Sequence, residues 1–384
     1  MKYPHIPSLR LQGYRPFQDF QADFSLLDVI VGANGSGKSS LFEFLKFLRD
    51  GMHQVIPPEI VAGSVGQQIF HRPGPDRIGW RIVVDLGPRG PLVYQGEVRG
   101  PIGQTRVSFE RAWTLEPAHN LMDIRERSGA IQDADGKLAE QELNLRKPNQ
   151  LALGVMTNPA FSMLYNLREF IAGWRFYSAF HINHQKIRQS VPVEQEPLLH
   201  EDGGNLSAVL FHLMTEHAQV FDDLKTYLRL AVPGFQNLTV KARGGPGEVI
   251  AFWQERGVDD ELSLADLSDG ILRFLCWTTL SLMPQPPTLL CIDEPAQGIH
   301  PRVLPILAGL FQDASERTQV LLGTHASYFL LQFDLEHLAV MRKREGESEY
   351  IKPQDSEALR ANLEAFGREE IEMMHRSDEL EALL

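Results

Sequence analysis

One segment of eight residues constrains this chain more than any other part of its sequence. Residues 32–39 match the pattern G-x-x-x-x-G-K-[ST] at every position. A short strand-like run at 28–31 precedes the segment, and residues 38–49 carry apolar side chains on a wide helical face. The sequence therefore predicts a tight glycine-rich loop that joins a buried strand to a helix.

A loop of this kind suits phosphate groups. Its glycines let backbone N–H groups curl around phosphate oxygens, and the following helix adds the positive end of its dipole. We expect Lys38 to reach the β- and γ-phosphates of a nucleotide and Ser39 to coordinate Mg²⁺. A chance glycine-rich loop is the alternative, and the flanking strand and helix disfavour it. The predicted nucleotide-binding residues of this loop are Gly32, Ala33, Asn34, Gly35, Ser36, Gly37, Lys38, Ser39 and Ser40.

A second candidate site follows an apolar strand at 289–292. This strand ends in Asp293 and Glu294, at the position where ligands bind in an open sheet of parallel strands. We expect Asp293 to hold the Mg²⁺, directly or through water, and Glu294 to orient or deprotonate an attacking water. A pair of helix-capping acids is the common alternative when such a pair stands alone.

The order of predicted elements indicates an α/β fold. Strands and helices alternate with short links from about residue 268 onward, which favours a mainly parallel central sheet. Runs between 78 and 115 predict an antiparallel β-meander, residues 116–148 a loop with a short helix, and 159–174 a helix. The predicted division is a lobe at 1–115, a short, mainly helical arm insertion at 116–174, a second lobe at 175–344 and an acidic helical tail at 345–384.

The order of the motifs resembles that of ABC-type ATPases. Leu267 to Gly270 looks like the signature motif of that family, and it lies between the phosphate loop and the acidic pair, with His325 after them. Within the family the chain is similar to the RecF/SMC-like branch, and to predicted AAA-type ATPases related to the overcoming-lysogenization-defect (OLD) proteins. The segments that carry this resemblance are 9–39, 204–210, 267–275 and 292–301.

This resemblance implies an ABC-type P-loop ATPase head and a set of roles. Ser268 and Gly270 would meet the γ-phosphate held by a second protomer, so that a homodimer encloses two ATP molecules. His325 would contact the γ-phosphate and sense its loss, while a buried histidine without that role is the alternative. Gln67 and Gln68 are candidates for the family's Mg²⁺-contacting glutamine, and surface glutamines are the alternative.

The function predicted from these features is Mg²⁺-dependent ATP hydrolysis, with Glu294, His325 and Lys38 as catalytic residues. The ATP-bound dimer would gate a nucleic-acid or effector-protein partner, in DNA repair and maintenance or in defence against phage. The alternative is the ATP-binding subunit of an ABC transporter. OLD nucleases carry a Toprim nuclease domain after the region matched here, and the sequence shows none, so we expect any nuclease or toxin effector on a separate chain.

The composition excludes other classes of protein. The 384 residues include two cysteines, so neither a disulfide scaffold nor a cysteine-rich zinc module is expected. The first residues lack an apolar signal segment, and no apolar run is long enough to span a bilayer. We therefore expect a soluble, cytoplasmic protein without a membrane partner.

The net charge of −13 at first argues against a nucleic-acid partner, but the charge is regional. Residues 345–384 contain 12 acids and 4 bases, a net charge of −8, whereas residues 71–190 contain 16 bases and 12 acids, a net charge of +4. Direct contact between the basic region and DNA and an ordinary solvated surface both remain open interpretations.

Overall fold

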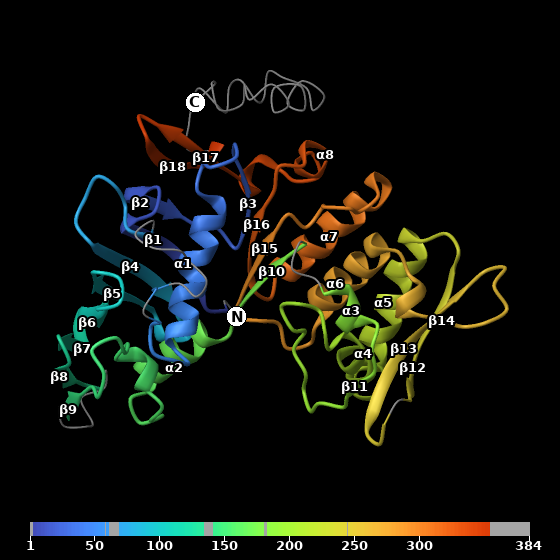
Figure 1. The fold of residues 1–384 in the computed structure, drawn as a ribbon, viewed down its shortest axis with the longest axis horizontal. Helices are drawn as coiled ribbons and strands as arrows, with labels where there is room; N and C mark the ends of the chain where they lie inside the picture. Colours follow the sequence, from blue (N-terminus) through green and yellow to red (C-terminus); the bar gives the residue numbers. More distant parts are fainter. Residues whose placement is uncertain are drawn as a thin grey trace.

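The computed structural model describes residues 3–57, 59–60, 69–133, 141–179, 183–243 and 245–353. A six-stranded sheet lies at the centre of the molecule, between two lobes (Figure 1). Its first five strands are parallel, and the last pairs antiparallel with its neighbour. In spatial order the strands are β10 (Trp174–Ser178), β15 (Leu289–Asp293), β16 (Gln319–Gly323), β3 (Leu27–Val31), β17 (Leu338–Arg344) and β18 (Glu347–Ile351).

Both faces of this central sheet are buried, which explains the near-continuous apolar runs of its strands. In β15, Leu289 and Cys291 belong to the core of one lobe, whereas Leu290 and Ile292 belong to the core of the other. Successive side chains of a strand point to opposite faces, so the sheet separates two hydrophobic cores. The predicted mainly parallel sheet is confirmed.

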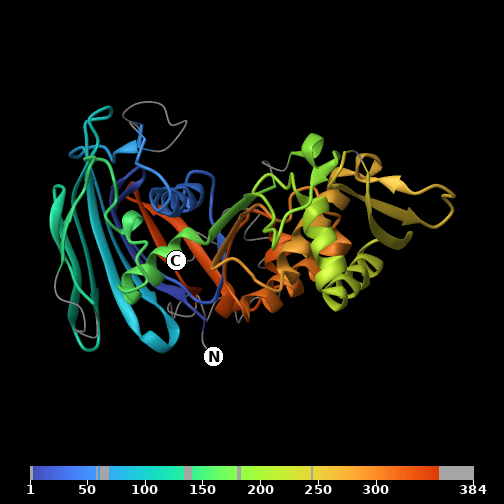
Figure 2. The same cartoon turned by 90° about the horizontal axis from the view of Figure 1, so that it is seen from below.

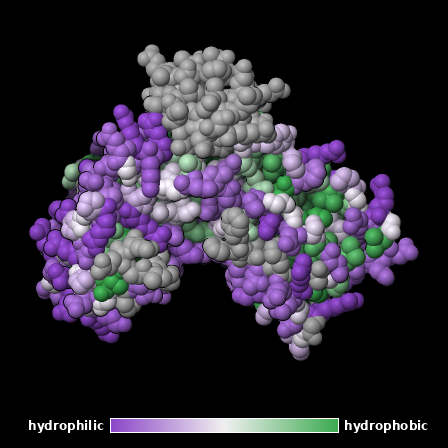
Figure 3. Space-filling model, turned by 45° about the horizontal axis from the view of Figure 1, so that its top comes forward, coloured by the Kyte–Doolittle hydropathy of each residue, from purple (hydrophilic) through white to green (hydrophobic). Residues whose placement is uncertain are grey.

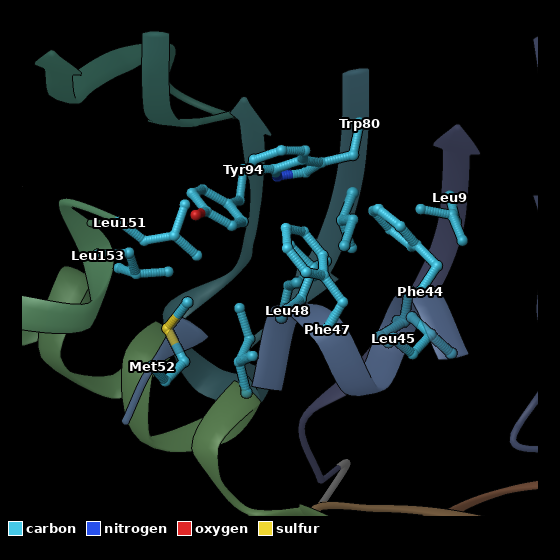
Figure 4. Packing of buried hydrophobic residues seen from close by; sticks show 14 of the residues in the cluster. Leu9, Phe44, Leu45, Phe47, Leu48, Met52, Trp80, Tyr94, Leu151 and Leu153 are labelled. Carbon is cyan, nitrogen blue, oxygen red and sulfur yellow. The ribbon is translucent and has the colours of Figure 1, made fainter. Parts of the chain in front are cut away.

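An eight-stranded antiparallel sheet forms the lobe at the left of Figure 1. Helix α1 (Lys38–Gly51) packs its apolar side chains, Phe44 and Phe47 among them, against residues of this sheet such as Trp80 and Tyr94 (Figure 4). The strands in spatial order are β2 (Phe17–Asp23), β1 (His5–Tyr14), β4 (Arg77–Asp85), β5 (Pro91–Arg99), β6 (Arg106–Thr114), β7 (His119–Arg125), β8 (Ser128–Ile131) and β9 (Gln141–Asn144).

The region 116–148 differs from its prediction. In place of a loop with a short helix, β7, β8 and β9 continue the meander among the described residues, and α2 (Ser162–Ala172) is the helix predicted at 159–174. The insertion at 116–174 is therefore not mainly helical. Its strands are short and mostly polar because they lie at the edge of the sheet, where few side chains reach the core, so hydrophobic periodicity gave no signal.

The lobe at the right of Figure 1 combines helices with a small antiparallel sheet, which lies at the far end of the molecule in Figure 2. Two consecutive helices of this lobe are separated at His217, where φ is −135°. The helices are α3 (His184–Ile187), α4 (Leu206–Glu216), α5 (Ala218–Ala231), α6 (Asp269–Leu282), α7 (Leu304–Ser315) and α8 (Ser327–Leu330). The strands are β11 (Val191–Pro192), β12 (Phe235–Ala242), β13 (Glu248–Glu255) and β14 (Leu262–Ser263).

The C-terminal strand β18 is tied to the strand that precedes the phosphate loop. Asp28 of β3 is fully buried, and its carboxylate accepts hydrogen bonds from Lys352 Nζ at 3.0 Å and from Tyr350 Oη at 2.6 Å. A buried carboxylate needs such partners because charge is costly to desolvate. Residues 347–351 are therefore a strand of the central sheet and not the start of the predicted helical tail. The tail from 354 lies outside the described residues.

Other expectations from the composition can be compared with the structure. Cys276 and Cys291 are free and buried, and burial raises the pKa of both thiols, for Cys276 to about 12. Among the described residues, no helix combines the length and the apolar character needed to cross a membrane. The division into domains at 115, 174 and 344 remains a prediction.

A buried carboxylate joins the meander to the segment that follows it. Glu110 of β6 is fully buried and accepts hydrogen bonds from Tyr94 Oη at 2.7 Å, from the backbone N–H of Leu153 at 3.2 Å and from that of Ala152. Burial outweighs these hydrogen bonds and raises the pKa of Glu110 to about 7.

Glu110 makes stability depend on pH. Its pKa lies above that of the unfolded chain, so its contribution is fully present at low pH and is lost as pH rises through about 7. We expect the free energy of unfolding to fall by roughly 3 kcal/mol between about pH 4.5 and pH 8 on this account. Urea unfolding across that range measures it. Glu110→Gln should remove this component, and an unchanged pH profile in the variant would contradict the assignment.

Candidate functional site

The phosphate loop lies between β3 and α1, as the sequence predicts. Gly35 and Gly37 adopt positive φ angles of 83° and 115°, which glycine adopts without steric cost. A side chain on Gly32 would place its Cβ 2.0 Å from the carbonyl oxygen of Met341 in the neighbouring strand β17. The pattern of glycines therefore follows from the tight path of the backbone and from its contact with the sheet.

The polar side chains of the loop face the region where phosphate would lie. Lys38 is buried, and its ammonium group donates to the carbonyl oxygens of Gly32 and, at 3.2 Å, of Ala33. Ser36 Oγ is buried and has no hydrogen-bond partner within the described part of the chain. A buried cation and an unsatisfied hydroxyl in one loop fit an anionic ligand.

The acidic pair reaches this loop because the strands are parallel. β15, β16 and β3 are neighbours, and Asp293, Gly323 and Ile30 lie in one row across them. Asp293 Oδ2 is 3.4 Å from Ser39 Oγ. A carboxylate and a hydroxyl are hard oxygen ligands of the kind Mg²⁺ prefers, so these two residues fit the predicted metal site.

Glu294 occupies a strained position next to this pair. Its φ angle is 54°, and its backbone N–H donates to the carbonyl oxygen of Gly323 at 2.7 Å. Its Oε2 accepts from Thr324 Oγ1 at 3.4 Å and from the backbone N–H of His325 at 3.3 Å, and Oε1 lies 3.7 Å from His325 Nε2. Burial, with a smaller contribution from the charge of Asp293, raises the pKa of Glu294, which favours acceptance of a proton.

These groups line one cavity of about 1040 Å³. It contains predicted residues from the phosphate loop together with Asp293, Glu294 and His325. Among the lining residues that the sequence analysis did not predict are Arg15, Phe70, Arg72 and Lys343. They come from the β1–β2 turn, the segment before β4 and the β17–β18 hairpin, and only the packing of both sheets brings them together.

The predicted signature residues are not among those that line this cavity in the described chain. Ser268 caps α6, and its Oγ accepts from the backbone N–H of Ile271 at 3.4 Å. Ser268 is thus the N-cap of this helix, and this role is compatible with a second one. Gln67 and Gln68 lie outside the described residues.

Helix α6 is held closely against the segment that follows the acidic pair. Arg273 Nη1 donates to the carbonyl oxygen of Gln297 at 3.2 Å, and Trp277 Nε1 donates to that of Pro295 at 3.1 Å. A Cβ on Gly270 would lie 2.6 Å from the carbonyl oxygen of Gly298. A displacement of Asp293 and Glu294 would therefore be transmitted to the start of α6.

Comparison with protein families identifies one matching model. The model described as "AAA domain, putative AbiEii toxin, Type IV TA system" matches residues 29–331, which is most of the chain and contains every predicted motif. The comparison with curated proteins finds no match.

Solved structures with a similar fold include head domains of SMC proteins. An Smc head bound to the C-winged helix domain of ScpA has 14% sequence identity and a TM-score of 0.55, covering 91% of this chain and 97% of that one. A head with an extended coiled coil, bound to the C-terminal domain of ScpA and derived from Pyrococcus furiosus, has 12% identity and a TM-score of 0.52, covering 91% and 96%. A head from Pyrococcus yayanosii has 11% identity and a TM-score of 0.52, covering 98% and 100%.

These likenesses establish the fold. The predicted α/β fold, with a mainly parallel sheet and an antiparallel meander, is confirmed as the fold of SMC heads. Together with the family match, they confirm the resemblance to the RecF/SMC-like branch.

A substitution at Gly270 tests whether the start of α6 packs directly against the segment that follows Asp293 and Glu294. Gly270→Ala should lower the free energy of unfolding by about 1–3 kcal/mol, since its Cβ meets a backbone oxygen that cannot rotate away. Gly309→Ala in α7 is the matched control, because no atom lies within 4 Å of its Cβ position. That change should stabilise by about 0.5–1 kcal/mol. Equal effects in urea unfolding would disprove the close contact.

Proposed function

The chain belongs to the family of AAA domains that this model describes, and we propose that it is a Mg²⁺-dependent ATPase of the SMC-head type. ATP would occupy the 1040 Å³ cavity, with its phosphates in the loop 32–39. Lys38 would bind the β- and γ-phosphate oxygens, and Ser39 and Asp293 would hold Mg²⁺, which supplies charge stabilisation to the phosphates.

The observation that carries the proposal is the meeting of two distant motifs. Ser39 and Asp293 are 254 positions apart in sequence, yet their side chains lie 3.4 Å apart at the floor of one cavity. Glu294 lines the same cavity and has the raised pKa of a proton acceptor. An attacking water that gives its proton to Glu294 would be oriented toward the γ-phosphate, and His325, 3.7 Å from Glu294, would contact that phosphate.

We further propose that hydrolysis requires two copies of the chain. The signature residues Ser268 and Gly270 begin a helix whose N-terminal N–H groups could bind an anion, but they do not line the cavity of their own chain. In a two-fold symmetric dimer the signature of each chain would complete the cavity of the other. A dimer of this kind would explain why the signature and the phosphate loop lie on separate surfaces of one chain.

The partner of the dimer is proposed from the comparisons. The family description names a toxin of type IV toxin–antitoxin systems, which supports a separate effector or antitoxin chain and a role in antiviral defence. Smc heads bound to a winged-helix domain of ScpA support instead a role in DNA maintenance or repair. The transporter alternative is disfavoured, because SMC heads match almost the whole chain.

The role of Glu294 is tested by Glu294→Gln. This variant should bind ATP with unchanged affinity, accumulate the ATP-bound dimer and hydrolyse ATP at least a hundredfold more slowly, because no group remains to take the proton. Phosphate release and light scattering measure the two effects. Glu316→Gln, at an exposed site after α7, is the matched control and should behave as the wild type. Turnover near the wild-type rate in Glu294→Gln would remove Glu294 from the mechanism.

The composite site is tested by mixing two inactive variants. Lys38→Ala disables the phosphate loop and Ser268→Arg disables the signature, so each alone should be inactive. A mixed dimer of one chain of each kind has one intact site, formed by the loop of the Ser268→Arg chain and the signature of the Lys38→Ala chain. An equimolar mixture should therefore recover about a quarter of the wild-type ATPase rate if the sites act independently. A mixture as inactive as its components would contradict the dimer.

A further inference from the structure

The eight-stranded sheet has a second face, opposite α1, which we call the outer face. Strand register places Arg10 beside Arg81, Arg81 beside Gln95, and Gln95 beside Arg111. Paired residues share a face, so three arginines lie in one row across β1, β4 and β6. Ala112, the neighbour of Arg111, belongs to the core on the opposite face. The lobe that contains this sheet is predominantly hydrophilic in Figure 3.

On strands β4 to β7 positive charge exceeds negative charge on the outer face, whereas Arg10 of β1 is paired with Asp19 of β2. Each of two carboxylates forms ion pairs with two arginines. One carboxylate neutralises only one positive charge, so each group of three side chains keeps a net positive charge that can attract a further anion. Glu97 lies 2.6 Å from Arg99 and 4.0 Å from Arg77, and Asp123 lies 3.2 Å from Arg111 and 3.5 Å from Arg125. These four arginine side chains are 43–74% exposed.

Aromatic rings lie among these arginines. Trp113 and Phe109 are both on β6 and are partly exposed on the outer face, and the guanidinium of Arg81 is 5.9 Å from the centre of the Trp113 ring. The other four tryptophans are at most 2% exposed. Trp113 is therefore the tryptophan whose ring is accessible to a ligand at the surface.

Two hollows flank Arg111 on this face. One, of about 290 Å³, is lined by Arg111, Trp113, Ala118, His119 and Asn120. The other, of about 470 Å³, is lined by Arg111 together with Gln95, Arg99, Ser108, Phe109, Arg125 and Glu126. Each hollow thus combines one aromatic ring with at least one guanidinium.

We propose that this part of the outer face binds single-stranded nucleic acid. One base would stack on Trp113 and another on Phe109, while Arg111, between the two hollows, would bind a phosphate of the backbone that connects them. Arg99 and Arg125 would contact flanking phosphates. Single-stranded nucleic acid would then be a partner of the ATPase proposed above. It would bind at a surface that shares no residue with the ATP cavity.

The spacing of the rings favours a single strand over a duplex. Trp113 and Phe109 are four residues apart on a strand, a separation of about 13 Å. Stacked bases of one strand are only about 3.4 Å apart, so the rings fit bases that are unstacked and splayed. A purely electrostatic surface for an acidic protein would need the arginines but would have no use for exposed rings.

The test measures binding of a labelled oligothymidylate of about 15 nucleotides by fluorescence anisotropy, without ATP. Trp113→Leu should weaken binding about tenfold, and Trp113→Phe should retain most of the affinity. Arg111→Gln should weaken binding and lower the slope of log affinity against log salt by about 0.7. Bound oligonucleotide should quench tryptophan fluorescence in the wild type and not in Trp113→Phe, because the other tryptophans are buried.

Matched controls separate this surface from general charge effects and from the ATPase. Arg256→Gln, at an exposed site after β13 in the other lobe, should leave affinity unchanged. Lys38→Ala should bind the oligonucleotide like the wild type, so failure of ATP hydrolysis and failure of this site are distinguishable. Equal affinity for a duplex of the same length, an unchanged affinity in both Trp113→Leu and Arg111→Gln, or binding of poly-glutamate in place of the oligonucleotide would overturn the proposal.

Discussion

The parallel pairing of β15, β16 and β3 is the constraint on which the rest of the molecule depends. Because these strands run in the same direction, the segments that follow them all emerge at one edge of the central sheet. The phosphate loop follows β3, the acidic pair ends β15, and His325 follows β16. Without this shared edge, Ser39 and Asp293 would not lie 3.4 Å apart.

The pairing is stable because the central sheet is covered on both sides. Alternate residues of its strands enter two different cores, one with α1 and the eight-stranded sheet, the other with α4 to α7. The cavity lies where the first lobe meets the central sheet, with Arg15 from the lobe and Glu294 from the edge of the sheet. The buried pair of Asp28 and Lys352 fixes the strand before the phosphate loop to the C-terminal hairpin.

Local patterns predicted the elements whose side chains repeat with a clear period. Helix α1, the strands of the central sheet and most of the meander were recognisable because one or both of their faces are apolar. Strands β8 and β9 were not recognisable, since a strand at a sheet edge is stabilised by backbone pairing that its side chains do not reveal.

The sequence by itself determined the chemistry of the site: the glycines, Lys38 and Ser39 of the loop, and the two acids after an apolar strand. Each of these signals is local, since a strand, a turn and a helix start are specified by neighbours along the chain. Only the tertiary structure decided the rest of the cavity, including Arg15, Arg72 and Lys343, and the row of arginines on the outer face. These residues come together through strand register and the packing of two sheets, which depend on contacts between residues far apart in the sequence.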